Sequence, residues 1–219
     1  MNNRKTPFAS AGNLLILIWF TLAMGVLIIL PKGEVVLWLN ARHNAFWDQA
    51  MVAWTFLGDG WAFAIALVAV ALVRFYHILP LLVAVVIQTV LVHLGKRVLF
   101  PGALRPKGWF DADTPLQFVE GIKVHLANSF PSGHTATGFT LAFLVMLLHR
   151  KAWSSALALM LAIGVGVSRM YLVLHFWEDV FAGSLVALVA VLLTWAICYR
   201  KEPAWAQRGF WGHRIIRLR

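Results

Sequence analysis

The hydrophobic positions of this chain fall into six long runs, separated by shorter polar segments. The runs lie at about 12–31, 51–73, 77–95, 132–149, 153–168 and 180–199. Each run is close to the roughly 20 residues that an α-helix needs to cross a bilayer. The pattern therefore predicts an all-α, polytopic membrane protein with six transmembrane helices.

The first two runs carry features of their own. Residues 58–60 (Gly-Asp-Gly) interrupt the second run, which predicts a short interfacial helix followed by a span that starts near Trp61. The first run follows Arg4 and Lys5, as a secretory signal would. It is longer than a typical signal h-region and reaches Pro31 without a clear small-residue cleavage site, so we expect an uncleaved anchor.

The composition agrees with a membrane protein. The chain of 219 residues is 61% hydrophobic and only 13% charged, and soluble domains carry about twice that charged fraction. This length favours one domain over residues 1–219, with no second folded unit beside the membrane core. The single cysteine, Cys198, excludes an intramolecular disulfide framework and a Cys-rich metal site.

The net charge of +10 would also suit a nucleic-acid-binding protein, but its placement favours a membrane. With the N-terminus inside, two of the three inner connections are tight basic turns, as the positive-inside rule expects. Residues 200–219 then form a basic cytoplasmic tail that lies on anionic lipid headgroups. Both termini are predicted to be cytoplasmic, and no nucleic-acid partner is expected.

One connection is much longer than the others. Residues 97–130, between the third and fourth runs, carry several prolines and charges, so they are not expected to span the membrane. Loops of this length are uncommon unless they are functional. We therefore predict an extramembrane loop that contributes to a catalytic site.

Polar and charged residues gather in three clusters that all fall on the outer side of this topology. They are Lys96, Arg97 and Arg105 after the third run, Ser132, Gly133 and His134 at the start of the fourth, and Arg169, His175 and Asp179 between the fifth and sixth. Because the outer ends of neighbouring spans can converge, the clusters are expected to share one pocket. Charges at such positions are costly unless they are paired or functional.

The first use of such a pocket is to bind an anion. Lys96, Arg105 and Arg169 supply positive donors, and an arginine fork matches two oxygens of a phosphate. Ser132 and Gly133 open a helix, whose free backbone N–H groups and dipole favour the same anion. Phosphate is the ligand that this donor set predicts.

The remaining residues suit phosphoryl transfer. His175 and Asp179 are four residues apart and share one face of a helix, so the carboxylate can fix the tautomer and leave the other ring nitrogen as a nucleophile. His134 is a second imidazole that can protonate a departing alkoxide. No metal or other cofactor is required, because the cations offset the charge of the phosphoryl oxygens.

These motifs resemble a known family. Arg105-Pro106, Pro131-Ser132-Gly133-His134 and Ser168-Arg169-x5-His175-x3-Asp179 are similar to the three signatures of the type 2 phosphatidic acid phosphatase (PAP2) superfamily, in its bacterial membrane lipid phosphatase branch. The resemblance implies a six-helix core with the site at one membrane face. It makes His175 the nucleophile, Asp179 its orienting partner and His134 the general acid. Its implied phosphate ligands are Lys96, Arg105, Ser132, Gly133 and Arg169.

The first motif departs from the family pattern, because Lys96 and Arg105 are two residues further apart than usual and Val98 takes the expected place of the lysine. An insertion around residues 100–102 (Phe-Pro-Gly) would restore the match. Either Lys96 or Arg97 then fits the phosphate-binding role, and Lys96 is preferred.

The sequence thus predicts a metal-independent phosphatase of the bacterial inner (plasma) membrane, with its site on the periplasmic or extracellular side. The candidate substrates by resemblance are undecaprenyl pyrophosphate, phosphatidylglycerophosphate, phosphatidic acid and lipid A, cleaved through a phosphohistidine. Two alternatives use the same residues. One is a lipid phosphotransferase, and the other is a non-enzymatic transporter with an anion or lipid site.

Overall fold

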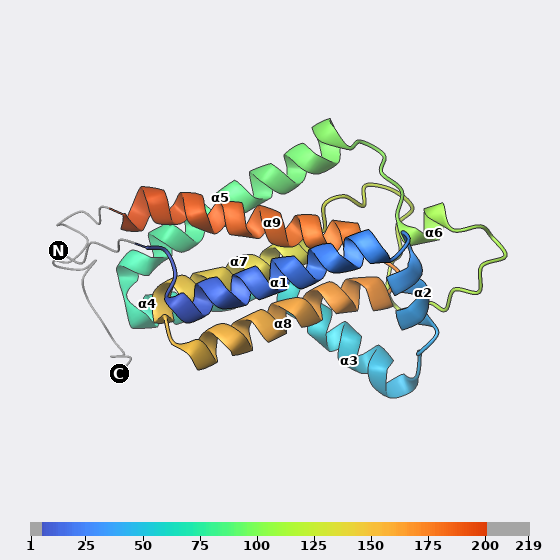
Figure 1. Cartoon of the computed structure of the whole chain (residues 1–219), viewed down its shortest axis with the longest axis horizontal. Coiled ribbons are helices and arrows are strands. Elements are labelled where there is room, and N and C mark those ends of the chain that lie inside the picture. Colours follow the sequence, from blue (N-terminus) through green and yellow to red (C-terminus); the bar gives the residue numbers. More distant parts are fainter. Residues whose placement is uncertain (1–5, 201–219) are drawn as a thin grey trace.

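The computed structural model describes residues 6–200, and every regular element in that range is a helix (Figure 1). The α-helices are α1 (Ser10–Ile29), α2 (Glu34–Asn40), α3 (Ala45–Thr55), α4 (Gly60–Val73), α5 (Ile78–Leu94), α6 (Pro106–Trp109), α7 (Gly133–His149), α8 (Ala152–Tyr171) and α9 (Trp177–Thr194). Turns of π-helix extend α5 over Gly95–Leu99 and α9 over Trp195–Tyr199. The basic pair at positions 4 and 5 and the basic tail predicted at 200–219, apart from Arg200, lie outside the described residues.

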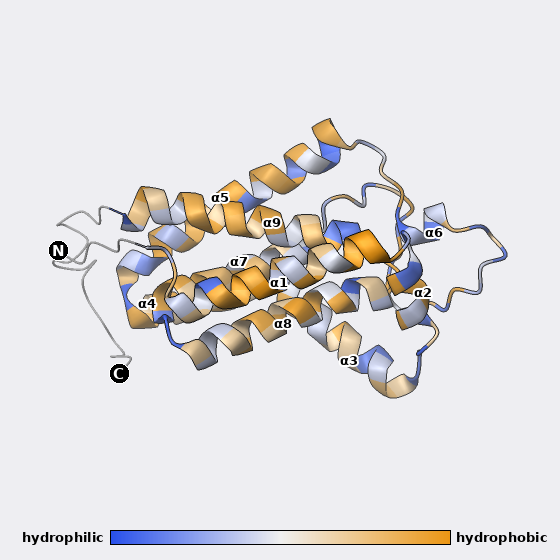
Figure 2. Ribbon diagram, viewed as in Figure 1, coloured by the Kyte–Doolittle hydropathy of each residue, from blue (hydrophilic) through white to orange (hydrophobic). Residues whose placement is uncertain are grey.

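Four helical segments within the described range are long and apolar enough to cross a membrane: Ser10–Ile29, Phe75–Leu99, Ala152–Tyr171 and Trp177–Tyr199. A fifth span is possible if Ala45–Gly58 and Gly60–Val73, which meet at a bend of 58°, count as one broken span. The helices are hydrophobic along most of their length (Figure 2). The protein is therefore membrane-embedded, and a sixth span over the shorter apolar helix α7 stays a prediction.

The break between α3 and α4 lies at the Gly-Asp-Gly sequence where the hydrophobic pattern is interrupted. The Asp59 side chain accepts a hydrogen bond of 2.7 Å from the Gly60 amide and caps α4. A Cβ atom at Gly58 would lie 2.7 Å from the backbone oxygen of His134 and 2.6 Å from a methyl of Val165. The absence of a side chain therefore lets the break pack directly against α7 and α8.

Helix α7 is the centre of the fold. It contacts α8 and α9 most extensively and also touches α4 and α5, and Phe139, Phe143 and Leu147 are fully buried. Trp19 of α1 packs on Phe139 with ring centroids 4.9 Å apart. Because α7 is enclosed by its neighbours, its N-terminus lies among the ends of α5, α8 and α9.

The long connection is anchored to the bundle by hydrogen bonds. Residues 97–99, which the sequence places in this loop, belong instead to the π-helical extension of α5, so the loop begins at Phe100. Asn40 of α2 exchanges two hydrogen bonds with the backbone of Gln117, at 2.8 and 2.9 Å. These contacts hold the loop, which includes α6, against α2 at one end of the helix bundle (Figure 1).

Small residues allow the helices to approach closely near the start of α7. A Cβ atom at Gly183 of α9 would lie only 2.6 Å from the backbone oxygen of Ser132. We expect Gly183→Ala to push this backbone away and to cost about 1–3 kcal/mol of stability, as overpacked sites do. Thermal unfolding in detergent measures the effect.

Gly25→Ala is the matched control, because a Cβ atom at this position of α1 would meet nothing within 4 Å. Its thermal midpoint should equal or exceed that of the wild type, since alanine is the better helix former. Equal midpoints for the two variants would contradict the close packing at Gly183.

Candidate active site

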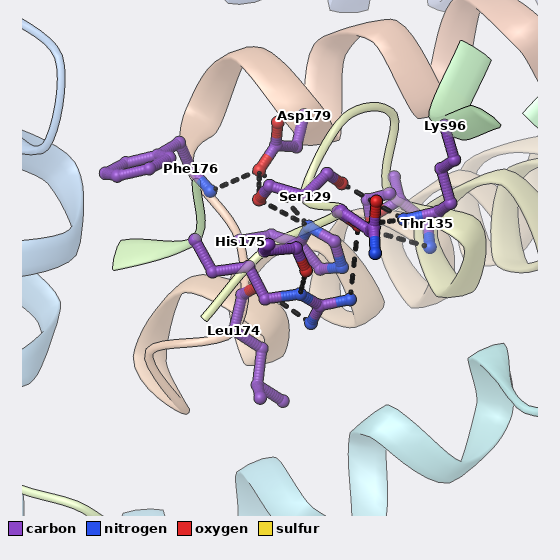
Figure 3. Close-up of polar contacts among 11 residues, drawn as sticks. Lys96, Ser129, Thr135, Leu174, His175, Phe176 and Asp179 are labelled. Atoms are coloured by element: carbon purple, nitrogen blue, oxygen red, sulfur yellow. Dashed lines mark hydrogen bonds and ion pairs between the residues drawn. The ribbon is translucent and has the colours of Figure 1, made fainter. Parts of the chain in front are cut away.

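The three polar clusters of the sequence meet at one end of the helix bundle. The π-helical extension of α5 brings Lys96 and the α8–α9 connection brings His175 (Figure 3). The loop after α5 adds Arg105, and the N-terminus of α7 adds His134. These groups lie within electrostatic range of one another and of Arg169. The structure therefore brings together residues that are far apart in the chain.

A tight turn after α8 positions the nucleophile candidate. Val173 has a φ of +58°, a left-handed conformation that is strained for a β-branched residue. The backbone N–H groups of Leu174 and His175 both donate to the carbonyl of Arg169, at 2.9 and 3.2 Å. Such strain often persists where the surroundings require a special geometry, and here it fixes the start of the His175 side chain.

His175 and Asp179 form a buried pair. The Nδ1 atom of His175 lies 3.2 Å from Oδ2 of Asp179, and the two residues are only 2% and 3% exposed. The same Oδ2 accepts a hydrogen bond of 2.8 Å from the backbone N–H of Phe176, which begins α9. The carboxylate therefore caps a helix and holds the imidazole at the same time.

Ser129 contacts both residues of this pair, and the sequence did not single it out. Its hydroxyl donates to Oδ2 of Asp179 over 2.5 Å and lies 3.3 Å from Nδ1 of His175. Figure 3 shows Ser129, near the end of the loop, beside Asp179 and His175. Only its position three residues before Ser132 could have suggested this contact, and nothing in the sequence indicates where the loop folds back.

The environment of His175 keeps its imidazole neutral. Burial lowers the pKa of His175 to about 3, and the interaction with Asp179 opposes this shift without overcoming it. Because the carboxylate only accepts hydrogen bonds, the ring proton belongs on Nδ1, where it faces Asp179. The other ring nitrogen then keeps a free lone pair, as a nucleophile requires.

Lys96 and Arg105 are drawn into the site by backbone carbonyls. The Lys96 ammonium donates to the carbonyls of Asn128 and Ser129 at 2.7 and 3.2 Å, whereas Arg97 is exposed. The structure thus places Lys96, and not Arg97, beside the other cations. The extra residues of the first motif coincide with the π-helical turn and a turn at Gly102, whose φ is +74°.

Arg105 is tied to both flanking segments of the site. Its guanidinium donates to the carbonyls of Ala127 and Leu174, at 3.0 and 3.1 Å. Burial lowers the pKa of Arg105 below its usual value, with Asp179 opposing the shift, but the group stays protonated at neutral pH. Arg105 therefore provides a fixed positive charge next to the His175 backbone.

Arg169 has unused hydrogen-bonding capacity. One of its terminal nitrogens donates to the Thr55 hydroxyl over 2.7 Å, while its buried Nε has no partner among the described residues. A buried N–H without an acceptor is costly, and an anion in the site would satisfy it. Thr55, at the end of α3, is a second contact that the sequence did not reveal.

The N-terminus of α7 faces the same space. Ser132 is its N-cap, and its hydroxyl accepts a hydrogen bond of 2.8 Å from the Thr135 hydroxyl, which leaves its own proton free to donate. A Cβ atom at Gly133 would meet only a methyl of Val92, at 3.7 Å. The His134 ring, half-buried, makes no hydrogen bond within residues 6–200. This helix end can therefore turn its free N–H groups toward an anion.

Comparison with known proteins identifies the family. The PAP2 superfamily model matches residues 77–203, which include all three clusters. The chain belongs to the PAP2 superfamily. The crystal structure of Aquifex aeolicus LpxE superposes with a TM-score of 0.66 at 26% identity, over 75% of this chain and 94% of that one. The crystal structure of a Bacillus subtilis PAP2-type phosphatidylglycerolphosphate phosphatase superposes with a TM-score of 0.57 at 22% identity, over 85% of this chain and 94% of that one. This second likeness supports the fold.

Relatives in sequence agree with this assignment. Lipid A 4'-phosphatase of Bacteroides thetaiotaomicron is 29% identical over 70% of each chain. The putative undecaprenyl-diphosphatase YbjG of Escherichia coli is 38% identical over 38% of this chain and 43% of its own length. Bacitracin transport permease protein BcrC of Bacillus licheniformis is 42% identical over 32% of this chain and 34% of its own length. The matches confirm the family recognised from the motifs, and the two relatives that are named a phosphatase and a putative diphosphatase agree with the predicted class of enzyme.

The neutral state of His175 can be measured directly. In a titration of protein with ¹⁵N-labelled histidine, the His175 signals should keep the pattern of the neutral, Nδ1-protonated ring between about pH 5 and 8, where an ordinary histidine titrates. Comparison with His175→Asn assigns the signals. A titration midpoint near the ordinary value of 6.5 would contradict the buried geometry.

Proposed function

We propose that this protein hydrolyses the phosphomonoester or diphosphate of a membrane lipid through a phosphohistidine at His175. The observation that carries this proposal is the buried pair of the His175 imidazole and the Asp179 carboxylate, which lies beside three cationic side chains. A nucleophile with a free lone pair and a surrounding set of donors is what attack on a phosphoryl group requires. Lys96, Arg105 and Arg169 would offset the charge of the phosphoryl oxygens, with the helix N-terminus of α7 as a fourth donor.

The reaction would run in two steps. The free ring nitrogen of His175 attacks phosphorus, the bond to the lipid oxygen breaks, and the protonated ring of His134 donates a proton to that oxygen and becomes neutral. Asp179 stabilises the positive charge that the ring acquires. Water, deprotonated by His134, then attacks the phosphohistidine, and inorganic phosphate leaves while His175 recovers its lone pair. Each half-reaction uses His134 in the opposite sense, as acid and then as base.

The candidate substrates come from the lipid phosphatases that the chain resembles. Three of the similar proteins have names that include a phosphate or diphosphate carried by a lipid, whereas one is named a transport permease. Undecaprenyl pyrophosphate, phosphatidylglycerophosphate, phosphatidic acid and lipid A therefore remain the candidates. We place the protein in a bacterial inner membrane with six spans and cytoplasmic termini. The site would then face the periplasm or exterior and take substrate from the outer leaflet.

Phosphate release from a panel of ³²P-labelled lipid phosphates, by the purified protein in detergent, tests the proposal. We expect free phosphate as the product, inhibition by vanadate, and no effect of EDTA. Transfer of the label to a second lipid would instead identify a phosphotransferase. A strict requirement for a divalent metal would contradict the mechanism, and binding without turnover would support the transporter alternative.

Variants of the catalytic pair define the nucleophile. His175→Asn should fold with a free energy of unfolding within about 1 kcal/mol of the wild-type value. It should nevertheless form no acid-labile phosphoenzyme in rapid-quench experiments. Asp179→Asn should form it more slowly, because the imidazole loses its orienting charge. Phosphoenzyme in His175→Asn would require another nucleophile and would refute the assignment.

Ser129→Ala tests the hydroxyl that bonds to Asp179. A hydrogen bond to a charged group contributes about 1.5–3 kcal/mol, so kcat should fall by about 10- to 100-fold with little change in KM. Ser154→Ala removes another buried hydroxyl, which bonds to the Lys151 carbonyl at the far end of α8. This control should keep full activity, and an equal loss in both variants would indicate a general effect on folding.

A further inference from the structure

An elongated apolar cavity of about 360 Å³ lies between α4, α5, α7 and α8. Its outer end is formed by Leu57, Gly138 and Val165, and its inner end by His77, Leu148 and Tyr199. From Gly138 to Leu148 it follows α7 for about 15 Å, at 1.5 Å per residue. The cavity is therefore a long slot that runs parallel to the helices through the apolar part of the protein.

The outer end of this slot lies one helical turn below the proposed phosphate site. Gly138 follows His134 by four residues on α7, and Val165 precedes Arg169 by four residues on α8. Gly58 packs tightly between the two layers, because a Cβ atom there would lie within 2.7 Å of both His134 and Val165. A chain attached to a phosphate at the cations would therefore have to pass beside this contact, over a distance of about one helical turn, to enter the slot.

We propose that this cavity binds one hydrocarbon chain of the lipid whose phosphate occupies the site at His175. This inference rests on the proposed function, since it requires the phosphate-bearing lipid to bind at that site. The direction of the slot agrees with it. A lipid of the outer leaflet has its phosphate at the outer ends of the helices and its chain directed inward, as the slot runs.

The walls of the slot suit a chain. Small side chains from three helices widen it, namely Ala62, Ala66 and Ala69 of α4, Ala142 of α7, and Ala158 and Ala162 of α8. At the inner end, the ring Nδ1 of His77 and the hydroxyl of Tyr199 bond to each other over 2.8 Å, so these polar atoms are turned to one another. An apolar lining of this kind holds hydrocarbon and disfavours water.

The inner end also limits the chain. Each methylene group that enters an apolar cavity strengthens binding, so affinity should rise with chain length until the chain reaches the level of His77 and Tyr199. Beyond that length, additional carbons must remain outside the slot and contribute less. The cavity would thus select substrates by the length of one chain, independently of the phosphate group.

Photo-crosslinking tests the occupant without the need for turnover. The probe is a lipid phosphonate with a diazirine in the middle of its chain, and the labelled peptides are mapped by mass spectrometry. Label is expected on α4, α7 and α8 in the wild type, and at least tenfold less in Ala66→Phe, which fills the slot. Ala64→Phe is the matched control, because Ala64 lies on the same helix, is exposed and does not line the cavity.

The same chain attached to an uncharged alcohol separates a substrate site from a site for any membrane lipid. Labelling of the slot by the alcohol as strongly as by the phosphonate would overturn the proposal, and so would equal labelling of the two phenylalanine variants. Weak labelling by the alcohol, with loss only in Ala66→Phe, would support it.

Kinetics provide the second readout. With a long-chain lipid phosphate, Ala66→Phe should raise KM about tenfold, whereas a short-chain lipid phosphate should be hydrolysed at the wild-type rate. Equal changes for both chain lengths would overturn the chain site and leave the phosphatase intact. Absence of phosphate release from either substrate would refute the proposed function, while the crosslinking result would still decide the occupant of the slot.

Discussion

A single buried carboxylate oxygen joins the parts of the site. Oδ2 of Asp179 accepts hydrogen bonds from the Ser129 hydroxyl, the His175 ring and the Phe176 amide. These donors come from the long loop, the α8–α9 turn and the start of α9. A buried carboxylate is stable only when its lone pairs are used, so this oxygen fixes the loop, the nucleophile and a helix end relative to one another.

The carboxylate also balances the cations around it. Lys96, Arg105 and Arg169 are partly or fully buried, and electrostatic attraction from Asp179 offsets part of this cost for Lys96 and Arg105. Much of the remaining hydrogen-bonding capacity of these cations is met by backbone carbonyls and by Thr55. One buried N–H group of Arg169 has no hydrogen-bond partner within residues 6–200. A bound anion would accept a hydrogen bond from it. The site is therefore preorganised for negative charge, as electrostatic catalysis requires.

The membrane shapes the rest of the molecule. In an apolar solvent, close contact between helices depends on small residues, and Gly58, Gly138 and Gly183 occupy positions where a Cβ atom would press on α7, on Val165 of α8 or on the Ser132 backbone. The same use of small residues leaves the slot between α4 and α8. The glycines thus allow dense packing near the proposed phosphate site, and the alanines leave free space next to it.

The sequence by itself determined the helical membrane architecture and the family, and it named most of the residues that the structure brings together. Hydrophobic runs report directly on burial in lipid, and motif residues such as His134, Arg169 and His175 are recognisable by type and spacing. Tertiary structure decided what depends on contacts between distant segments. Ser129 and Thr55 have no local signature, since their roles exist only where the loop and α3 fold onto α8 and α9. The sequence preferred Lys96 over Arg97 for the phosphate, and the structure adds the contacts of Lys96 with the carbonyls of Asn128 and Ser129, which no local pattern indicates.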